Sequence, residues 1–197
     1  MKYNLAANSS SNMNTNLVKW GTAIILSVVM TSCVSIKTPS RPDLVPVQAP
    51  VKIGNYPVRI ERSVNLNDKE TIVTTVIWHY FNNADSKDTA LLGQATHIEL
   101  QLLDNKSLRA TLHQNDVVLR EVTLKGKLKN GYFRTKHDFK LKGIPPFYWT
   151  TTSSKTQFGL GSEGQLYIDT AGETNGSILI IMAGTPGFTQ SITVWAY

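Results

Sequence analysis

The sequence predicts a mainly β protein: an antiparallel barrel or sandwich of about eight or nine strands with one N-terminal helix, preceded by an apolar leader and a proline-rich segment. After Gly93, apolar and polar residues alternate with a period of two, the pattern of half-buried strands. Asn130-Gly131, between two such runs, is typical of a two-residue hairpin turn. Further turn residues recur at short intervals up to the C-terminus, which favours a barrel or sandwich.

The leader ends on Cys33, the only cysteine of the 197-residue chain. Lys19 precedes an apolar run over residues 22–30, and small residues follow that run. A helix needs about 20 apolar residues to cross a bilayer, so this run is too short to span one. Its length and flanks predict an export signal with a processing site.

Residues 30–33, Met-Thr-Ser-Cys, resemble the lipobox of bacterial lipoproteins, and the resemblance covers about residues 13–33. It implies a signal peptide over residues 1–32, with Met13 as an alternative start. It also implies that the Cys33 thiol receives a diacylglycerol and that the new amino terminus receives a fatty acid such as palmitate. In the enterobacterial sorting rule, Asp directly after the lipidated Cys is a signal for the inner membrane. Val34 occupies this position, so the rule implies the outer membrane.

Residues 33–55 predict an extended tether between the lipidated Cys33 and the globular domain. This segment shows little apolar periodicity and contains four prolines: Pro39, Pro42, Pro46 and Pro50. Proline-rich chains extend by about 3.1 Å per residue. The β-rich domain is therefore predicted over residues 56–197, a length that suffices for a core without disulfides.

One helix is predicted over residues 66–81. Asn67 followed by Glu70 forms a capping-box pattern at its start. Apolar residues recur with helical spacing at Ile72, Val73, Val76, Ile77, Tyr80 and Phe81. The β-branched residues of 71–77 favour a strand instead, but we give the spacing more weight than the propensity.

The strands are predicted from the alternation that follows. A turn is expected at Asn130-Gly131 and another over residues 172–176, which contain two glycines. The predicted strands cover residues 98–102, 108–112, 117–129, 132–142, 147–152, 156–160, 165–170, 177–183 and 191–196.

The Asn130-Gly131 turn also fixes the register of its hairpin, in which Lys127 faces Arg134. One face is then apolar, with Leu128, Phe133 and Phe139, and His137 falls on it. The other face is basic and carries Lys125, Lys127, Arg134, Lys136, Lys140 and Lys142. Like charges opposite each other on a sheet repel. The basic face therefore predicts either a fully solvated surface or a binding site for anionic lipid, lipopolysaccharide or an acidic envelope polymer.

No residue pattern predicts catalysis, a metal site or a cofactor. The four histidines lack the close spacing of metal ligands, and a lipidated Cys33 cannot act as a nucleophile. The aromatic residues 147–149 follow two prolines. They predict either a core plug at a strand corner or a platform that stacks on sugar rings.

Charge and composition narrow the function further. Of the 20 Lys and Arg residues, only Lys2 and Lys19 precede Cys33, and all 14 Asp and Glu residues follow it. The remaining chain thus carries 18 positive and 14 negative charges, a net charge of +4, which does not indicate a nucleic-acid partner. We predict a non-enzymatic, lipid-anchored binding or structural protein of the bacterial cell envelope. The alternatives are a lipocalin-like carrier of a small apolar ligand and a hydrolase of envelope glycans.

Overall fold

The computed structural model describes residues 36, 38–66, 68–82, 88–144, 147–178 and 181–197, all of them in the second of the chain's two units, Val34–Tyr197. The predicted signal peptide, residues 1–32, and the lipidation residue Cys33 lie outside the described residues. No helix within the described ranges is both long and apolar enough to span a bilayer.

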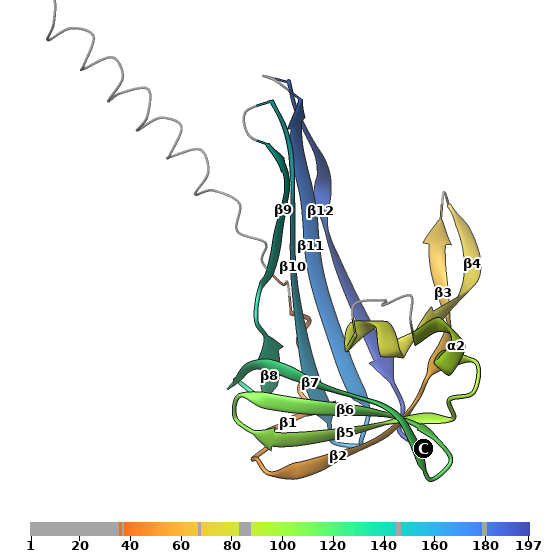
Figure 1. The fold of residues 1–197 in the computed structure, drawn as a ribbon. Coiled ribbons are helices and arrows are strands. Elements are labelled where there is room, and N and C mark those ends of the chain that lie inside the picture. Colours follow the sequence, from red (N-terminus) through yellow and green to blue (C-terminus); the bar gives the residue numbers. More distant parts are fainter. Residues whose placement is uncertain (1–35, 37, 67, 83–87, 145–146, 179–180) are drawn as a thin grey trace, which may run out of the picture. The chain divides into compact units, whose positions relative to one another are not determined.

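The unit is mainly β and every strand pair is antiparallel (Figure 1). Its described residues include two short helical segments: η1, a 3-10 turn at Ile77–Tyr80, and α2 at Thr89–Leu92. The strands are β1 (Leu44–Val45), β2 (Val51–Pro57), β3 (Arg59–Leu66), β4 (Lys69–Val76), β5 (His97–Asp104), β6 (Ser107–Gln114), β7 (Val117–Lys129), β8 (Tyr132–Thr135), β9 (Asp138–Ile144), β10 (Tyr148–Gly161), β11 (Leu166–Ile178) and β12 (Ile181–Val194).

Ten strands form one sheet in the order β12-β11-β10-β8-β7-β6-β5-β2, with β1 and β9 also paired to β10, and β3 and β4 form a separate hairpin. The sheet is rolled but open, because β2 and β12 are not paired to each other. Its two ends still approach: the Tyr197 amide donates to the Asn55 carbonyl at 3.1 Å. The prediction of a closed barrel or of two stacked sheets is therefore wrong in detail, while the mainly β class is confirmed.

The core lies inside the roll and uses the predicted two-residue alternation. In β5, the side chains of Ile98, Leu100 and Leu102 are at most 1 % exposed. They face Leu112, Ala110 and Leu108 of β6, which are fully buried. Phe133 of β8 and Phe158 of β10 are paired neighbours in the same core. These predictions hold because one face of each strand is buried, which gives the sequence its period of two.

The predicted helix over residues 66–81 is wrong. Most of it is the strand β4, which pairs with β3 from Leu66↔Lys69 to Arg59↔Val76, and only Ile77–Tyr80 are helical. Glu70 does not cap a helix, since its Oε1 accepts a hydrogen bond from Ser63 Oγ on β3 at 2.6 Å. Asp68 adopts a positive φ of 60° in the tight turn between the strands. The β-branched run prevails because a pairing partner, β3, lies directly before it.

The segment predicted as a free tether is largely folded onto the domain. Leu44 and Val45 pair with Gly161 and Leu160 of β10, and β2 supplies an end strand of the sheet. Arg41 forms an ion pair with the buried Asp169 of β11 at 2.8 Å. The proline count alone does not reveal these long-range contacts, so the domain extends further towards the N-terminus than the sequence indicates.

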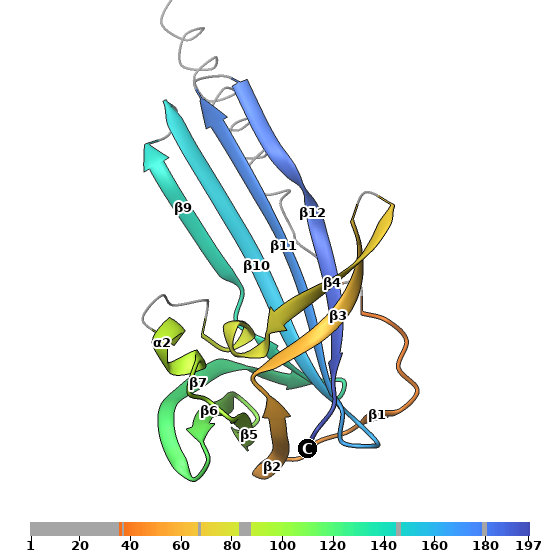
Figure 2. The same cartoon turned by 90° about the vertical axis from the view of Figure 1, so that its right-hand side faces the viewer.

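The C-terminal strands are longer than predicted. Residues 172–176, predicted as a turn, lie inside β11, where the ladder to β12 has a bulge between Gly172 and Thr174. A Cβ at Gly172 would come within 2.8 Å of the Phe188 ring, so the exposed Phe188 side chain would have to move to make room for it. The distal sheet, defined as residues 138–144, 148–154, 172–178 and 181–188 of β9 to β12, extends away from the rolled core in both views (Figures 1 and 2).

Candidate functional site

The β7–β8 hairpin has the register that the sequence predicts. Lys127 pairs with Arg134 and Leu128 with Phe133, and the Lys136 amide donates to the Lys125 carbonyl at 3.0 Å. Asn130 and Gly131 both have positive φ, 53° and 78°, as a type I′ turn requires. The hairpin thus brings four of the six predicted basic residues together: Lys125, Lys127, Arg134 and Lys136.

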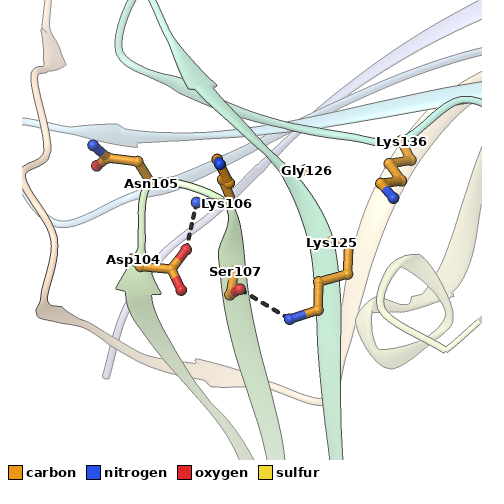
Figure 3. Close-up of a pocket in the computed structure, with 7 residues that line it drawn as sticks. All are labelled: Asp104, Asn105, Lys106, Ser107, Lys125, Gly126 and Lys136. Carbon is orange, nitrogen blue, oxygen red and sulfur yellow. Dashed lines mark hydrogen bonds between the residues drawn. The ribbon is translucent and has the colours of Figure 1, made fainter.

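Two adjoining hollows lie among these residues. The first measures about 560 Å³ and is lined by Asp104, Asn105, Lys106, Ser107, Lys125, Gly126 and Lys136 (Figure 3). The second measures about 440 Å³ and is lined by Gly126, Lys127, Lys129, Arg134, Thr135, Lys136 and His137. Because Gly126 and Lys136 line both, we treat them as one surface and call it the basic hollow.

Gly126 shapes the basic hollow. Its amide donates to the Lys106 carbonyl at 2.9 Å, which holds the β5–β6 turn against β7. A Cβ at this position would lie 2.2 Å from the Arg134 carbonyl oxygen and 2.9 Å from the Phe133 ring. Real Cβ atoms do not approach backbone so closely, so a side chain here would force the hairpin apart. The concave shape therefore depends on a glycine at this position.

Six cationic side chains surround the hollow, and in the described part of the chain none of them forms an ion pair with a carboxylate; they are Lys106, Lys125, Lys127, Lys129, Arg134 and Lys136. The one carboxylate of the lining, Asp104, accepts the Lys106 amide at 2.6 Å, and this hydrogen bond lowers the pKa of Asp104. Lys125 Nζ donates to Ser107 Oγ at 3.1 Å, as Figure 3 shows.

Arg134 gives the strongest sign of a missing partner. Its Nε is buried and has no hydrogen-bond partner among the described residues. A buried donor without an acceptor costs about 1–3 kcal/mol, and more when the group is charged. The Arg134 side chain also lines the hollow, and a guanidinium binds phosphate and carboxylate oxygens in pairs.

Lys140 and Lys142 are not part of this surface. Arg134 pairs with Gln157 of β10, and Asp138 pairs with Ser154 of the same strand. Arg134 and Asp138 are four residues apart, whereas their two partners are only three apart. The extra residue at Lys136–His137 reverses the faces, as a bulge does. Lys140 and Lys142 therefore lie on the face opposite Arg134, and the prediction of one continuous basic face is wrong beyond Lys136.

The same break moves two residues that were predicted to be apolar-facing. Phe139 is 54 % exposed rather than in the core. His137 is also exposed; it lines the basic hollow, and its Nε2 lies 2.6 Å from Ser153 Oγ. Of the aromatic residues 147–149, predicted as either a core plug or a platform, Phe147 and Tyr148 are 63 % and 55 % exposed and Trp149 is half-buried, so they do not form a core plug.

A second polar cluster, which the sequence does not predict, lies on the outer side of β10 to β12. Asp169 is fully buried and accepts from Arg41 Nη2 at 2.8 Å, Gln157 Nε2 at 2.9 Å and Ser191 Oγ at 2.7 Å. The Arg41 guanidinium lies 3.9 Å from the centre of the Tyr167 ring. All these bonds are satisfied within the chain, so the cluster fixes the segment around Arg41 in place rather than offering a free site.

His97 and His113 form a cross-strand stacked pair on β5 and β6, with ring centres 4.8 Å apart. Burial, followed by the neighbouring His113, lowers the pKa of His97 below its ordinary value of 6.5. His113 Nε2 is buried without a hydrogen-bond partner in the described part of the chain. Sequence spacing hides this pair because the residues are 16 positions apart and meet only through strand pairing.

This pair predicts a pH dependence of stability. The folded chain takes a proton at His97 less readily than the unfolded chain, so the free energy of unfolding is expected to fall as the pH drops from about 7.5 through 6.5. Urea denaturation at pH 7.5 and 5.5 measures the change, and His97→Gln is expected to reduce it. The lowered pKa of Glu99, caused mainly by its hydrogen bond from Lys52, acts below 4.5 and outside this window. An unchanged pH dependence in His97→Gln contradicts the prediction.

Comparisons of the chain with protein-family models, with curated proteins and with solved structures find no match.

Proposed function

We propose that this protein is a lipid-anchored, non-enzymatic component of the bacterial cell envelope that binds a phosphate-bearing anion in the basic hollow. The lipobox resemblance at residues 30–33 supports the anchor and the location, with the outer membrane as the expected site. The observation that carries the binding proposal is the set of six cations around Gly126, none of which forms an ion pair within the described residues; one of them, Arg134, also has a buried Nε without a hydrogen-bond partner there.

Lipopolysaccharide and acidic envelope polymers both present the required chemistry. Their phosphate or carboxylate oxygens accept hydrogen bonds from Lys and Arg, and their negative charge lowers the repulsion between Lys127 and Arg134, which face each other across the hairpin. The basic hollow is open to solvent rather than enclosed, which suits a polymer or a head group on a larger molecule.

A carrier function has less support. The apolar hollow inside the roll, between Val47, Phe133 and Leu166, measures only about 10 Å³. Ligand pockets for small molecules usually measure about 300–1,000 Å³. The core is thus filled by its own side chains at this place, and we favour surface binding over a lipocalin-like role.

A glycan hydrolase also has less support. Such enzymes use two carboxylates that face each other across the substrate. Among the described residues, the two buried aspartates are already engaged in structural bonds: Asp169 with Arg41, and Asp88 with the Trp78 indole at 2.8 Å. We therefore place the function in binding.

The proposal is tested by the affinity of the full chain for lipopolysaccharide and, separately, for a soluble polyphosphate. The triple variant Lys125→Gln, Lys127→Gln, Arg134→Gln is expected to bind roughly 10- to 100-fold more weakly, since three charge contacts of about 0.5–1 kcal/mol each are lost. Binding of the parent chain is expected to weaken with added salt, because mobile ions screen exposed charges.

A matched control removes three charges elsewhere: Lys69→Gln, Lys140→Gln, Lys142→Gln. It is expected to keep its affinity for polyphosphate near that of the parent, which separates the hollow from net charge. The double variant Lys125→Gln, Lys127→Gln leaves the partly buried Arg134 in place and guards against a folding defect. Equal binding by the triple variant and the control, or binding that does not respond to salt, refutes the proposal.

A further inference from the structure

The far end of the distal sheet carries an apolar row that crosses all four strands. Ile144 of β9 pairs with Tyr148 of β10, Tyr148 pairs with Ile178 of β11, and Ile178 pairs with Ile181 of β12. Directly paired residues project from the same face of a sheet, so these four side chains form one line. We call this line the tip row.

The tip row is unusually exposed for its composition. Its side chains are 60 %, 55 %, 70 % and 73 % exposed in the order Ile144, Tyr148, Ile178 and Ile181. Phe147, in the turn beside Tyr148, is a further 63 % exposed. Single exposed apolar residues are ordinary, but a contiguous group of this kind marks a binding surface. The rolled core contributes nothing to cover it, because the distal sheet extends away from that core (Figures 1 and 2).

Positive charge follows directly behind the tip row, on the same face. Lys142 and Lys140 stand two and four residues behind Ile144 on β9, which places them about 7 and 13 Å back along the strand. Lys140 is paired with Asp138 at 3.1 Å, whereas Lys142 has no carboxylate partner among the described residues. On the neighbouring strand β10, Thr150 pairs with Lys142 and Thr152 pairs with Lys140, so short side chains lie beside both lysines on this face.

We propose that the tip row inserts into the surface of an anionic phospholipid bilayer. The head-group layer on each side of a bilayer is about 5–8 Å thick. When the isoleucines reach the acyl boundary, Lys142 lies at the level of the lipid phosphates, where a cation gains from the negative surface potential. Tyr148 and the half-buried Trp149 next to it are residue types that favour the membrane–water interface.

This inference goes beyond the proposed function and needs neither Cys33 nor the basic hollow. It adds a second, reversible membrane contact made by the folded domain. We favour a bilayer over a second copy of the chain as the partner of the tip row because of Lys142. If two tip rows faced each other, the Lys142 side chains of the two copies would also approach and repel each other.

The test uses the full chain with Cys33→Ser, so that one introduced cysteine is the only thiol. An environment-sensitive fluorophore is attached to Ile178→Cys or, as a matched control, to Ile72→Cys. Ile72 lies on β4 and is 72 % exposed against 70 % for Ile178. Residues 1–33 are the same in both proteins, so any vesicle binding through them is shared.

With phosphatidylcholine vesicles that contain phosphatidylglycerol, the Ile178 probe is expected to shift to the blue and to be quenched by nitroxide-labelled lipid. The Ile72 probe is expected to do neither. Equal responses of the two probes, or none, overturn the proposal. A blue shift of the Ile178 probe that grows with protein concentration without vesicles also overturns it, because a second copy then covers the row.

Unlabelled variants test the same point by vesicle co-sedimentation. Ile178→Asp with Ile181→Asp is expected to weaken the tip contact at least about tenfold, and Ile72→Asp to leave it unchanged. Lys142→Gln is expected to weaken binding to anionic vesicles about fivefold, and Lys69→Gln to have no effect. Polyphosphate binding in the Ile178→Asp, Ile181→Asp variant reports on the basic hollow separately, so the two proposals fail independently.

Discussion

A Cys33→Ser variant is expected to incorporate no fatty acid, because the lipobox resemblance makes the Cys33 thiol the attachment point of the diacylglycerol. Acyl chains contribute about 0.8 kcal/mol for each buried CH₂, and two chains already give stable attachment. Because the Cys33→Ser chain has no thiol to receive the lipid, we expect fatty-acid incorporation to be abolished rather than reduced. The measurement is expression in a bacterium fed an alkyne-tagged palmitate, followed by mass spectrometry of the purified protein.

Ser35→Ala serves as the control, since it changes a hydroxyl residue two positions from the attachment point and leaves residues 30–33 intact. It is expected to be labelled and to start at Cys33, without residues 1–32. The Cys33→Ser chain is expected to keep those residues. An unlabelled parent chain, or a labelled Cys33→Ser chain, rules out the lipid anchor and leaves the basic hollow and the tip row to be judged by their own experiments.

Asp169→Asn is expected to lower the free energy of unfolding by about 3–5 kcal/mol. The Asp169 side chain is fully buried and that of Arg41 is only 8 % exposed, so the substitution leaves the Arg41 charge buried without its counter-charge. The whole free energy of unfolding of a domain is typically about 5–15 kcal/mol, so the expected effect is large. Urea denaturation of the full chain measures it.

Two controls identify the cause of that loss. Asp138→Asn removes the exposed ion pair with Lys140, in which the side chains are 40 % and 56 % exposed, and is expected to cost less than about 1 kcal/mol. The double variant Arg41→Met, Asp169→Leu removes both buried charges and is expected to be more stable than Asp169→Asn alone. A double variant that is less stable than Asp169→Asn would show that the hydrogen bonds of Gln157 and Ser191, not the charge, are decisive.

The fold was predictable where the signal is local. The alternation in β5 and β6 and the Asn130-Gly131 turn are complete within a few residues, so their burial and register follow from the sequence. The helix prediction failed because residues 66–81 carry a helical spacing and a strand propensity at once. Only the pairing of β4 with β3 decides between them, and that pairing is a tertiary fact.

The candidate site was predictable only in part for a similar reason. The Asn130-Gly131 turn correctly predicts that Lys127 lies opposite Arg134, but one continuous basic face would require an unbroken strand up to Lys142. The break at Lys136–His137 reverses the face of everything after it, because side chains alternate with a strict period of two. Lys106 was missed altogether, since it comes from the β5–β6 turn and joins the hollow only when its carbonyl accepts the Gly126 amide.

The sequence by itself determined the mainly β class, the core faces of β5 and β6 and the register of the β7–β8 hairpin, and the lipidation of Cys33 stays a prediction from sequence. Each rests on neighbours in the chain. Only the tertiary structure decided that the sheet rolls without closing, that Arg41 docks on Asp169 and that four apolar residues line up across the distal sheet. These arrangements depend on pairs of distant residues, such as Arg41 with Asp169 and Tyr148 with Ile178, and on the burial and pairing of the whole sheet, which no short segment encodes.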